Sequence, residues 1–521
     1  MIRELLIAAA LTFLYLAASA QEVTEKEEEG LENQAVKENA EQKDDGSLQQ
    51  SAWLLKHPIA INETDGGELV RLHLISDLQA GYLVQYRKTA GVLIHPYELQ
   101  AVPGWDQETI RRVLPYISFV VIQPLSLQFR NRFTGGERQL LFRFTRTLEK
   151  AVGYDTISNG FAGDRNQYQL RYQYRYGNLL SYGFVADKDA GERFFSGTSR
   201  AGFDFYSGHV FLRRMGIIKA LALGDFTVNL GQGLIQWQAL AFGKSTDLTG
   251  AKRQGEVLQP YRSAGEYLFN RGAGITVGRG RWEGTLFTSF RKYNALVDDS
   301  AHTYSSIQTS GLSRTASEIK ARRALGDLSA GGRLHYHQGT VKTSFNVVAH
   351  RFPASRIASP EPYISFLSGD ASLLNASMDY SFTVHNFHFF GEEAMDKKGH
   401  VAFINSFLCS LGSQVDVAVV NRRMDRAYQS FQSNAFTESG SGSGETGTYV
   451  ALAWRPVYTL QVSGYSDHYR FPWLKYRVDA PAAGSEHLAQ VQYQPDKKST
   501  LYLRYRISNQ PLNEPGSTLN A

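Results

Sequence analysis

A phosphate-binding loop is the first chemistry that the sequence suggests, at Gly243-Lys244-Ser245-Thr246. Such a loop cradles phosphates with backbone N–H groups and a lysine, and it needs a second glycine five residues before the Gly-Lys pair. That position is Gln238, so the motif is incomplete. Gly231-Gln232-Gly233 likewise lacks the third glycine of a dinucleotide-binding turn. Neither stretch predicts nucleotide chemistry.

The candidate metal-binding and acid–base groups in the sequence also lack residues that such sites need. His335 and His337 share one face of a strand, but no cysteine or carboxylate lies at ligand spacing. Glu392 and Glu393 are adjacent, so on a strand they point to opposite faces and cannot act on one bond. Cys409 lies in an apolar run, where we expect it to pack as bulk. We therefore predict no enzyme activity, no metal site and no cofactor.

Aromatic and charged residues alternate strictly from Tyr168 to Tyr176, as Tyr-Gln-Leu-Arg-Tyr-Gln-Tyr-Arg-Tyr. A strand places the tyrosines and Leu170 on one face and the Gln and Arg residues on the other. A soluble sandwich would turn the apolar face inward, whereas a membrane barrel would turn it to lipid and the arginines to a wet lumen. For a barrel we expect Tyr168, Leu170, Tyr172 and Tyr174 to face lipid, and we expect these arginines to line the lumen: Arg171, Arg175, Arg504 and Arg506.

The N-terminus has the features of a secretory signal. Met1–Ala20 contains Arg3, an apolar run from Leu5 to Ala17, and small residues before Gln21. A membrane anchor is the alternative, but the run is short for a spanning helix. Residues 21–51 are polar and acidic, with too little apolar content for a core, so we expect a flexible spacer.

The composition of the exported chain favours a barrel. The 521 residues include 28 Tyr, 30 Phe and 47 Gly, and the one Cys excludes an internal disulfide. The mean hydropathy is −0.31, which fits a barrel because its lumen face is polar. After the signal, no apolar stretch is long enough for a transmembrane helix. The net charge of +5 is small for this length and identifies no partner.

Strand-like alternation continues from residue 117 to the end of the chain, and tight and long connections largely alternate. That alternation is typical of a barrel with short periplasmic turns and long external loops. We predict an all-β transmembrane antiparallel barrel over residues 117–521, with about 16–18 strands. Our count reaches about 17, whereas single-chain bacterial barrels have even numbers. Either the count is wrong by one strand or the barrel is incomplete at its C-terminus, and we expect the second. Tight turns are predicted at Gly177-Asn178, Arg279-Gly280, Gln338-Gly339, His385-Asn386, Gly412-Ser413, Arg455-Pro456 and Asp496-Lys497.

A small all-α domain is predicted before the barrel, over residues 52–116. Ser76-Asp77-Leu78-Gln79 is a capping box that opens a helix. Asn62 or Thr64 is expected to cap a short helix that carries Leu69 and Leu72. Asp106 is expected to cap a third helix, which Pro115 ends.

This domain resembles the tandem helix-hairpin-helix module of the ComEA-type competence proteins, which is also RuvA domain 2-like. The resemblance rests on Ile61-Asn62-Glu63-Thr64, Glu68-Leu69, Tyr86-Arg87, Gly91, Glu98-Leu99 and Val102-Pro103-Gly104, and it spans roughly residues 58–115. It implies sequence-independent DNA binding, in which backbone N–H groups at a helix start meet a phosphate. The residues implied are Gly104, Trp105, Arg87, Lys88, Arg111 and Arg112.

The sequence departs from that pattern at both hairpins. The first, His73–Ser76, has no glycine, and Asp106 replaces the second glycine of the other hairpin. A carboxylate there opposes a phosphate. The alternative is that the helices serve as a periplasmic docking or plug element.

The rest of the chain resembles large outer-membrane barrels that carry this N-terminal module. The resemblance rests on Gly224-Asp225-Phe226, Leu230-Gly231-Gln232-Gly233-Leu234, Phe242-Gly243-Lys244, Arg271-Gly272 and Tyr469-Arg470-Phe471-Pro472-Trp473. It implies an outer-membrane location with the helices in the periplasm, and no chemistry. Three functions stay open: DNA uptake, a passive or gated solute pore, and a structural or assembly role. The expected partners are outer-membrane lipid, DNA and periplasmic proteins, and the sequence leaves the small-molecule substrate unknown.

Overall fold

The computed structural model describes residues 53–119, 129–155, 159–197, 199–298, 300–357, 362–366, 369–412, 414–440, 444–496 and 499–513. The predicted signal peptide (residues 1–20) and acidic spacer (residues 21–51) lie outside the described residues.

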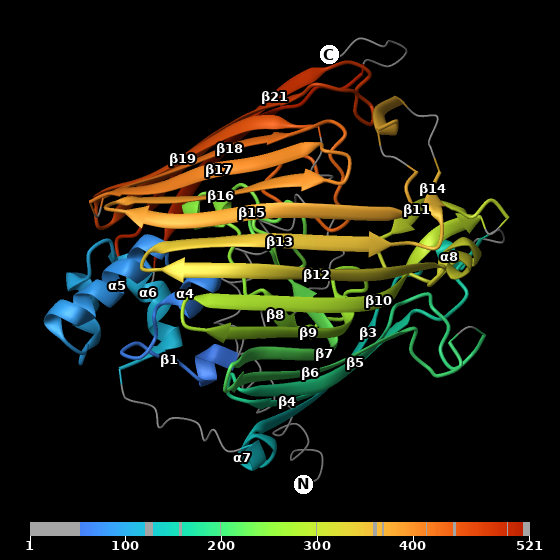
Figure 1. Ribbon diagram of the computed structural model, residues 1–521, viewed down its shortest axis with the longest axis horizontal. Helices are drawn as coiled ribbons and strands as arrows, with labels where there is room; N and C mark the ends of the chain where they lie inside the picture. Colours follow the sequence, from blue (N-terminus) through green and yellow to red (C-terminus); the bar gives the residue numbers. More distant parts are fainter. Residues whose placement is uncertain are drawn as a thin grey trace, which may run out of the picture.

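One antiparallel sheet, β3 to β22, curls into a barrel (Figure 1). Of its twenty described strands, three are short pieces within connections: β8 (Leu258–Pro260), β11 (Thr303–Gln308) and β14 (Ser355–Arg356). The other seventeen are long: β3 (Glu137–Arg146), β4 (Asn166–Tyr176), β5 (Leu180–Lys188), β6 (Phe205–Met215), β7 (Ile218–Val228), β9 (Asn270–Arg279), β10 (Trp282–Asp298), β12 (Leu325–Gln338), β13 (Val341–Arg351), β15 (Ser372–Val384), β16 (Phe387–Asp396), β17 (Val401–Leu411), β18 (Val415–Met424), β19 (Thr446–Val457), β20 (Leu460–Phe471), β21 (Ala482–Tyr493) and β22 (Leu501–Asn509). The predicted fold class is confirmed. Because seventeen is odd, β3 and β22 run in the same direction on the two sides of the seam.

The two ends of the barrel differ in their connections. At the left of Figure 1 lie the tight turns, which we call the turn end; the long connections lie at the opposite, loop end. The turns at Gly177-Asn178, Arg279-Gly280, Gln338-Gly339 and His385-Asn386 are confirmed, while Ser413 and Lys497 lie outside the described residues.

The predicted turn at Arg455-Pro456 is wrong. Both residues lie inside β19, and the β19–β20 register shifts between Trp454 and Val457. A bulge accommodates proline in a strand because its missing N–H is not needed there. The actual turn is at Tyr458 and Thr459.

The outer face of the barrel is apolar, and the inner face is polar. On β10, Leu286 and Phe290 are 68% and 59% exposed, whereas Thr285 and Ser289 are 3% and 2% exposed. This arrangement is the reverse of a soluble protein, and a continuous exposed apolar belt is what a bilayer covers.

Leu286→Arg should therefore destabilise the barrel by about 2–4 kcal/mol, because it places a charge on the outward face between Trp282 and Phe290. Ser289→Ala, on the inner face of the same strand, should change stability by less than about 1 kcal/mol. Urea unfolding in lipid vesicles, followed by Trp fluorescence, measures both. Equal effects of the two substitutions would contradict the assignment of faces.

One predicted lipid-facing residue is covered. Tyr174 is 0% exposed, and its hydroxyl donates to the carbonyl of Arg132 at 2.8 Å. The short helix α7 (Phe129–Thr134) lies over the turn end of β4. The side chains of β4 still alternate between the two faces, but at this end the outer face is covered by another part of the chain and not by lipid.

The N-terminal helical segment has its own core. It comprises α4 (Gly67–Arg71), α5 (Asp77–Ala90), η1 (Pro96–Ala101), α6 (Gln107–Val113) and η2 (Leu114–Tyr116), closed by the parallel strands β1 (Ile59–Ala60) and β2 (Ile117–Ser118). The Ser76 capping box and the Asp106 cap are confirmed. The capping prediction for α4 is wrong: its N-cap is Gly66, at a φ of 81°, which glycine adopts without strain. Within the described residues no helix combines the length and apolar content needed to cross a bilayer.

Candidate functional site: the occluded lumen

The connection between β7 and β9 (residues 229–269), which we call the first inner loop, enters the barrel. The β6–β7 ladder ends at Gly224, and beyond it β7 pairs with β8 instead. A side chain at Gly224 would meet the Gly208 carbonyl at 2.3 Å, so glycine permits this departure. Leu230, Leu234 and Ile235 are each 1% exposed and share a core cluster with inner-face strand residues.

A second inner loop, residues 425–445 between β18 and β19, packs against the first. The Tyr428 hydroxyl donates to the Leu234 carbonyl at 3.0 Å. The Gln238 amide donates to the Gln432 side chain at 2.7 Å, and both residues are buried. The described residues of the two loops thus pack against each other and against the inner face of the wall, in a region where an open pore would hold water.

Glu392, on the inner face of β16, anchors the first inner loop. Its carboxylate is 0% exposed and accepts the backbone N–H groups of Gln232 at 2.7 Å and Leu234 at 3.0 Å. A side chain at Gly231 would meet the Glu392 carboxyl carbon at 2.4 Å. The Gly231-Gln232-Gly233 turn is thus an anion-binding nest whose anion is a carboxylate of the barrel wall.

A buried ionic network joins both inner loops to the wall. The Arg422 guanidinium is 0% exposed and bonds Asp467 at 2.8 and 2.9 Å and Glu445 at 2.6 Å. Lys244, in the incomplete phosphate motif, contacts Glu438 and Asp467. Since its ammonium is surrounded by carboxylates, Lys244 holds the loop in place rather than binding phosphate.

The helical segment covers the turn end of the lumen (Figure 1). The Asp77 carboxylate, at the start of α5, bonds Lys252 of the first inner loop at 2.7 Å. Lys252 also lies 2.9 Å from His388 of β16. Burial on its own would raise the pKa of Asp77, but the charges of Lys252 and His388 bring that pKa below its ordinary value. The Tyr82 hydroxyl donates to Asn386, in a barrel turn, at 3.0 Å.

Further ion pairs surround this contact. Arg71 lies 3.4 Å from Glu256, which also pairs with Arg213 of β6. Burial would raise the pKa of Glu256, but these two arginines lower it to about 2. Three more polar contacts join Arg112 to Asp247 at 3.5 Å, Asp106 to Arg455 at 2.6 Å and His57 to Glu137 at 3.1 Å. The interface is therefore mainly ionic, which is typical of contacts that can separate.

The residues predicted to bind nucleic acid differ in their exposure and in their contacts. Trp105 is 4% exposed and donates its indole N–H to Gln79, and Arg87 donates to the Ile61 carbonyl. Lys88 is exposed, and Arg112 pairs with the first inner loop. Gly104 has a φ of 74°, and Arg111 is half-buried on α6.

The helix start expected to meet a phosphate faces the barrel instead. One oxygen of Asp106 caps Thr109, and the other bonds Arg455.

The predicted lumen arginines lie along two strands near the seam. Arg171 and Arg175 on β4 are each 7% exposed. Arg504 and Arg506 lie on β22. Arg504 donates to Gln490, and Arg506 lies 3.0 Å from Glu486; Gln490 and Glu486 are on the inner face of β21.

Sequence reasoning missed the residues that close the lumen, above all Glu392, Lys252 and Asp77. Two signals in the sequence could have pointed to them. One is Glu392, an isolated carboxylate on the inner face of a strand, and the other is Gly231-Gln232-Gly233, a glycine-rich turn that lacks the rest of a phosphate-binding motif. Among the described residues, no three His, Cys, Asp or Glu side chains gather as a metal site.

At the loop end, three carboxyl groups lie close together: Glu192 and Asp204, which are buried, and Glu266, which is half-buried. Burial and mutual repulsion raise the pKa of Glu192 to about 9, of Asp204 to about 7 and of Glu266 to about 8. Glu192 also ties the β5–β6 connection to Ser313, whose N–H it accepts at 2.7 Å.

The packed connections hold the protons of these three carboxyl groups more tightly than separated connections would. The contact between the β5–β6 connection and the segment around Ser313 should therefore be strongest below about pH 4.5 and should weaken as pH rises toward 9. We expect faster hydrogen exchange in residues 189–204 and 309–315 at pH 9 than at pH 6. Glu266→Gln should reduce this difference. Exchange that slows with rising pH, after correction for the intrinsic rate, would contradict the arrangement.

Comparison with known proteins finds outer-membrane proteins of low similarity among the solved structures. No family model and no curated protein sequence matches the chain. Wzi, an Escherichia coli outer-membrane protein involved in group 1 capsule assembly and a carbohydrate-binding β-barrel, is 12% identical, with a TM-score of 0.36 over 87% of this chain and 96% of that one. OccK5 (OpdH) of Pseudomonas aeruginosa is 11% identical, with a TM-score of 0.34 over 72% and 91%. The outer-membrane protein OpdK of the same species is 10% identical, with a TM-score of 0.34 over 66% and 88%. At these values the likenesses carry no information on ligand or activity.

Proposed function

We propose that the protein is an outer-membrane solute channel, held closed by its two inner loops and its N-terminal helical segment. The observation that carries the proposal is the ionic attachment of the helical segment to the first inner loop, through Asp77–Lys252 and Arg71–Glu256. A segment bound to the loop that fills the pore can control that loop. The exposed apolar belt supports the membrane location, and the turn end then faces the periplasm.

The test is to remove the first inner loop without disturbing the wall. Asn229 and Val257 are joined by a backbone hydrogen bond of 3.0 Å, so the chain can be reconnected there as a hairpin. Replacing residues 231–255 with Asn-Gly supplies the two-residue turn that such a hairpin favours. We expect the intact protein to give little solute flux in liposome swelling and the shortened variant to give a large flux.

Folding of the shortened variant is checked by heat-modifiable migration and by its recovery in outer membranes. Glu392→Gln in the intact chain is the milder companion, because it keeps the shape of the anchor and removes its charge. Its flux should lie between the other two. A folded shortened variant as impermeable as the intact protein would exclude the channel.

DNA binding by the helical segment stays a prediction. Binding through phosphates should be weak and steeply salt-dependent, with a log–log slope near roughly −0.9 per phosphate neutralised. In the docked arrangement Asp106 opposes a phosphate and bonds Arg455, so we expect Asp106→Gly to be needed for any binding. No binding at low salt by the full chain, with or without Asp106→Gly, would leave docking as the role of the segment.

A further inference from the structure

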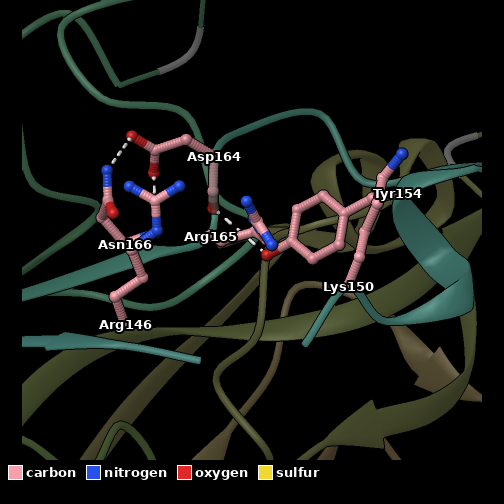
Figure 2. A pocket seen from close by; sticks show the side chains of 6 residues that line it. All are labelled: Arg146, Lys150, Tyr154, Asp164, Arg165 and Asn166. Carbon is pink, nitrogen blue, oxygen red and sulfur yellow. Dashed lines mark hydrogen bonds between the residues drawn. The ribbon is translucent and has the colours of Figure 1, made fainter. Parts of the chain in front are cut away.

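A cationic pocket lies at the loop end of β3 and β4, away from the lumen. It encloses about 370 Å³ and is lined by Arg146, Lys150, Tyr154, Asp164, Arg165 and Asn166. Figure 2 shows these side chains, with the Tyr154 hydroxyl donating to the Asp164 carbonyl and the Asn166 amide donating to the Asp164 carboxylate.

The pocket carries surplus positive charge. The Asp164 carboxylate contacts Lys188, whose side chain is 0% exposed. Burial would raise the pKa of Asp164, but Lys188 and Asn166 bring it below its ordinary value, so the carboxylate stays ionised and paired. Lys150 pairs with Asp155. The two pairs cancel, which leaves the charges of Arg146 and Arg165.

Both arginines are available to a ligand. Arg165 donates one N–H to the Leu148 carbonyl at 2.9 Å, which leaves other donors of its guanidinium. Arg146 is exposed, and its guanidinium has no hydrogen-bond or ion-pair partner within the part of the chain that the structure describes. Two guanidinium groups at one pocket suit a phosphate, because each presents a fork of donors to its oxygens.

The position of the pocket indicates the source of that phosphate. Arg146 pairs in register with Asn166, and Phe144 pairs with Tyr168, two residues closer to the turn end on the same face. The Phe144 and Tyr168 rings lie 5.5 Å apart, and Leu140, Phe142 and Phe144 are 70%, 63% and 53% exposed. The pocket thus continues the lipid-facing apolar stripe at its outer limit, where aromatic side chains mark the interface.

We propose that this pocket binds the phosphorylated head group of an outer-leaflet glycolipid. The inference rests on the outer-membrane location proposed above. Acyl chains lie along the apolar stripe, and the head-group phosphate meets Arg146 and Arg165 above it, as cationic pockets bordering a bilayer bind anionic head groups.

The experiment measures lipid binding to the full-length protein in a non-ionic detergent, by native mass spectrometry. The probes are bisphosphorylated lipid A, the same lipid without phosphates, and inorganic phosphate. We expect the phosphorylated lipid to bind at least tenfold more tightly than the dephosphorylated one. Arg146→Gln with Arg165→Gln should abolish that preference. The matched control is Arg138→Gln, on the same face of β3 near the turn end, and it should bind like the unchanged protein.

Heat-modifiable migration confirms that each variant folds. Equal binding of the two lipids, or an unchanged preference in the double variant, would overturn the proposal. Binding of inorganic phosphate without binding of the lipid would also overturn it, in favour of a soluble phosphate compound. Membrane fractionation tests the proposed outer-membrane location independently of lipid binding. A wrong location and a wrong assignment of the pocket therefore give different results.

Discussion

Replacing Arg422 with methionine should destabilise the barrel by about 3 kcal/mol, the lower end of the range of about 3–5 kcal/mol that is typical for breaking a buried ion pair. The substitution leaves Glu445 and Asp467, both 0% exposed, without their shared cation. An unpaired buried charge has lost its water and gains nothing in return. The effect is moderated because Lys244 still contacts Asp467.

Arg423→Met is the matched control, because Arg423 is the next residue of β18 and points to the exposed face. It should change stability by less than about 1 kcal/mol. Urea unfolding in vesicles measures both variants. A triple variant, Arg422→Met with Glu445→Gln and Asp467→Asn, should recover part of the loss, since replacing every charge of a buried network is often close to neutral. Equal stability of Arg422→Met and Arg423→Met would contradict a charged network in the lumen.

Local patterns predicted the elements of this fold well. The alternation from Tyr168 to Tyr176 and the capping box at Ser76 are short-range signals, because side-chain direction in a strand and N–H capping in a helix depend on neighbours a few residues apart. The covered Tyr174 shows the limit of such signals. Alternation assigns a face, but it does not say whether lipid or another part of the chain covers that face.

The closed lumen was beyond sequence reasoning because its contacts are remote. Glu392 and the N–H of Gln232 are separated by 160 residues, and Lys252 and Asp77 by 175. The local sequence around one partner contains no information that identifies the other partner. The same applies to Lys244, whose motif suggested phosphate while the fold supplies it with carboxylates.

Asp77→Asn should release the helical segment from the barrel and raise solute flux. The substitution keeps the size of the side chain but leaves the Lys252 ammonium, 9% exposed, without its anion. Breaking a buried pair in this way weakens the contact by about 3–5 kcal/mol. The measurements are flux in liposomes and the rate at which trypsin cleaves the helical segment, and both should rise together. Glu63→Gln, at an exposed acid of the same segment, should change neither.

Acidification should act on the same interface. Because the docked state lowers the pKa of Asp77, its contribution is present above about pH 3.8 and lost as pH falls further. His73 contacts Phe242 of the first inner loop. Burial lowers the pKa of His73 from 6.5 to about 4; the negative charge of Asp247 opposes this shift, and the positive charges of Arg253 and Arg112 add to it. Docking should therefore already weaken as pH falls from 6.5 toward 4, where free His73 binds a proton that the docked form excludes.

Two further variants separate the ion pair from the rest of the interface. Lys252→Met added to Asp77→Asn removes the stranded ammonium, so trypsin cleavage should slow relative to Asp77→Asn alone. His73→Phe should remove the part of the pH dependence between 6.5 and 4 and leave flux at pH 7 unchanged. If Asp77→Asn frees the helices while flux stays low, the two inner loops alone close the pore, and the helical segment is a docked domain without a gating role.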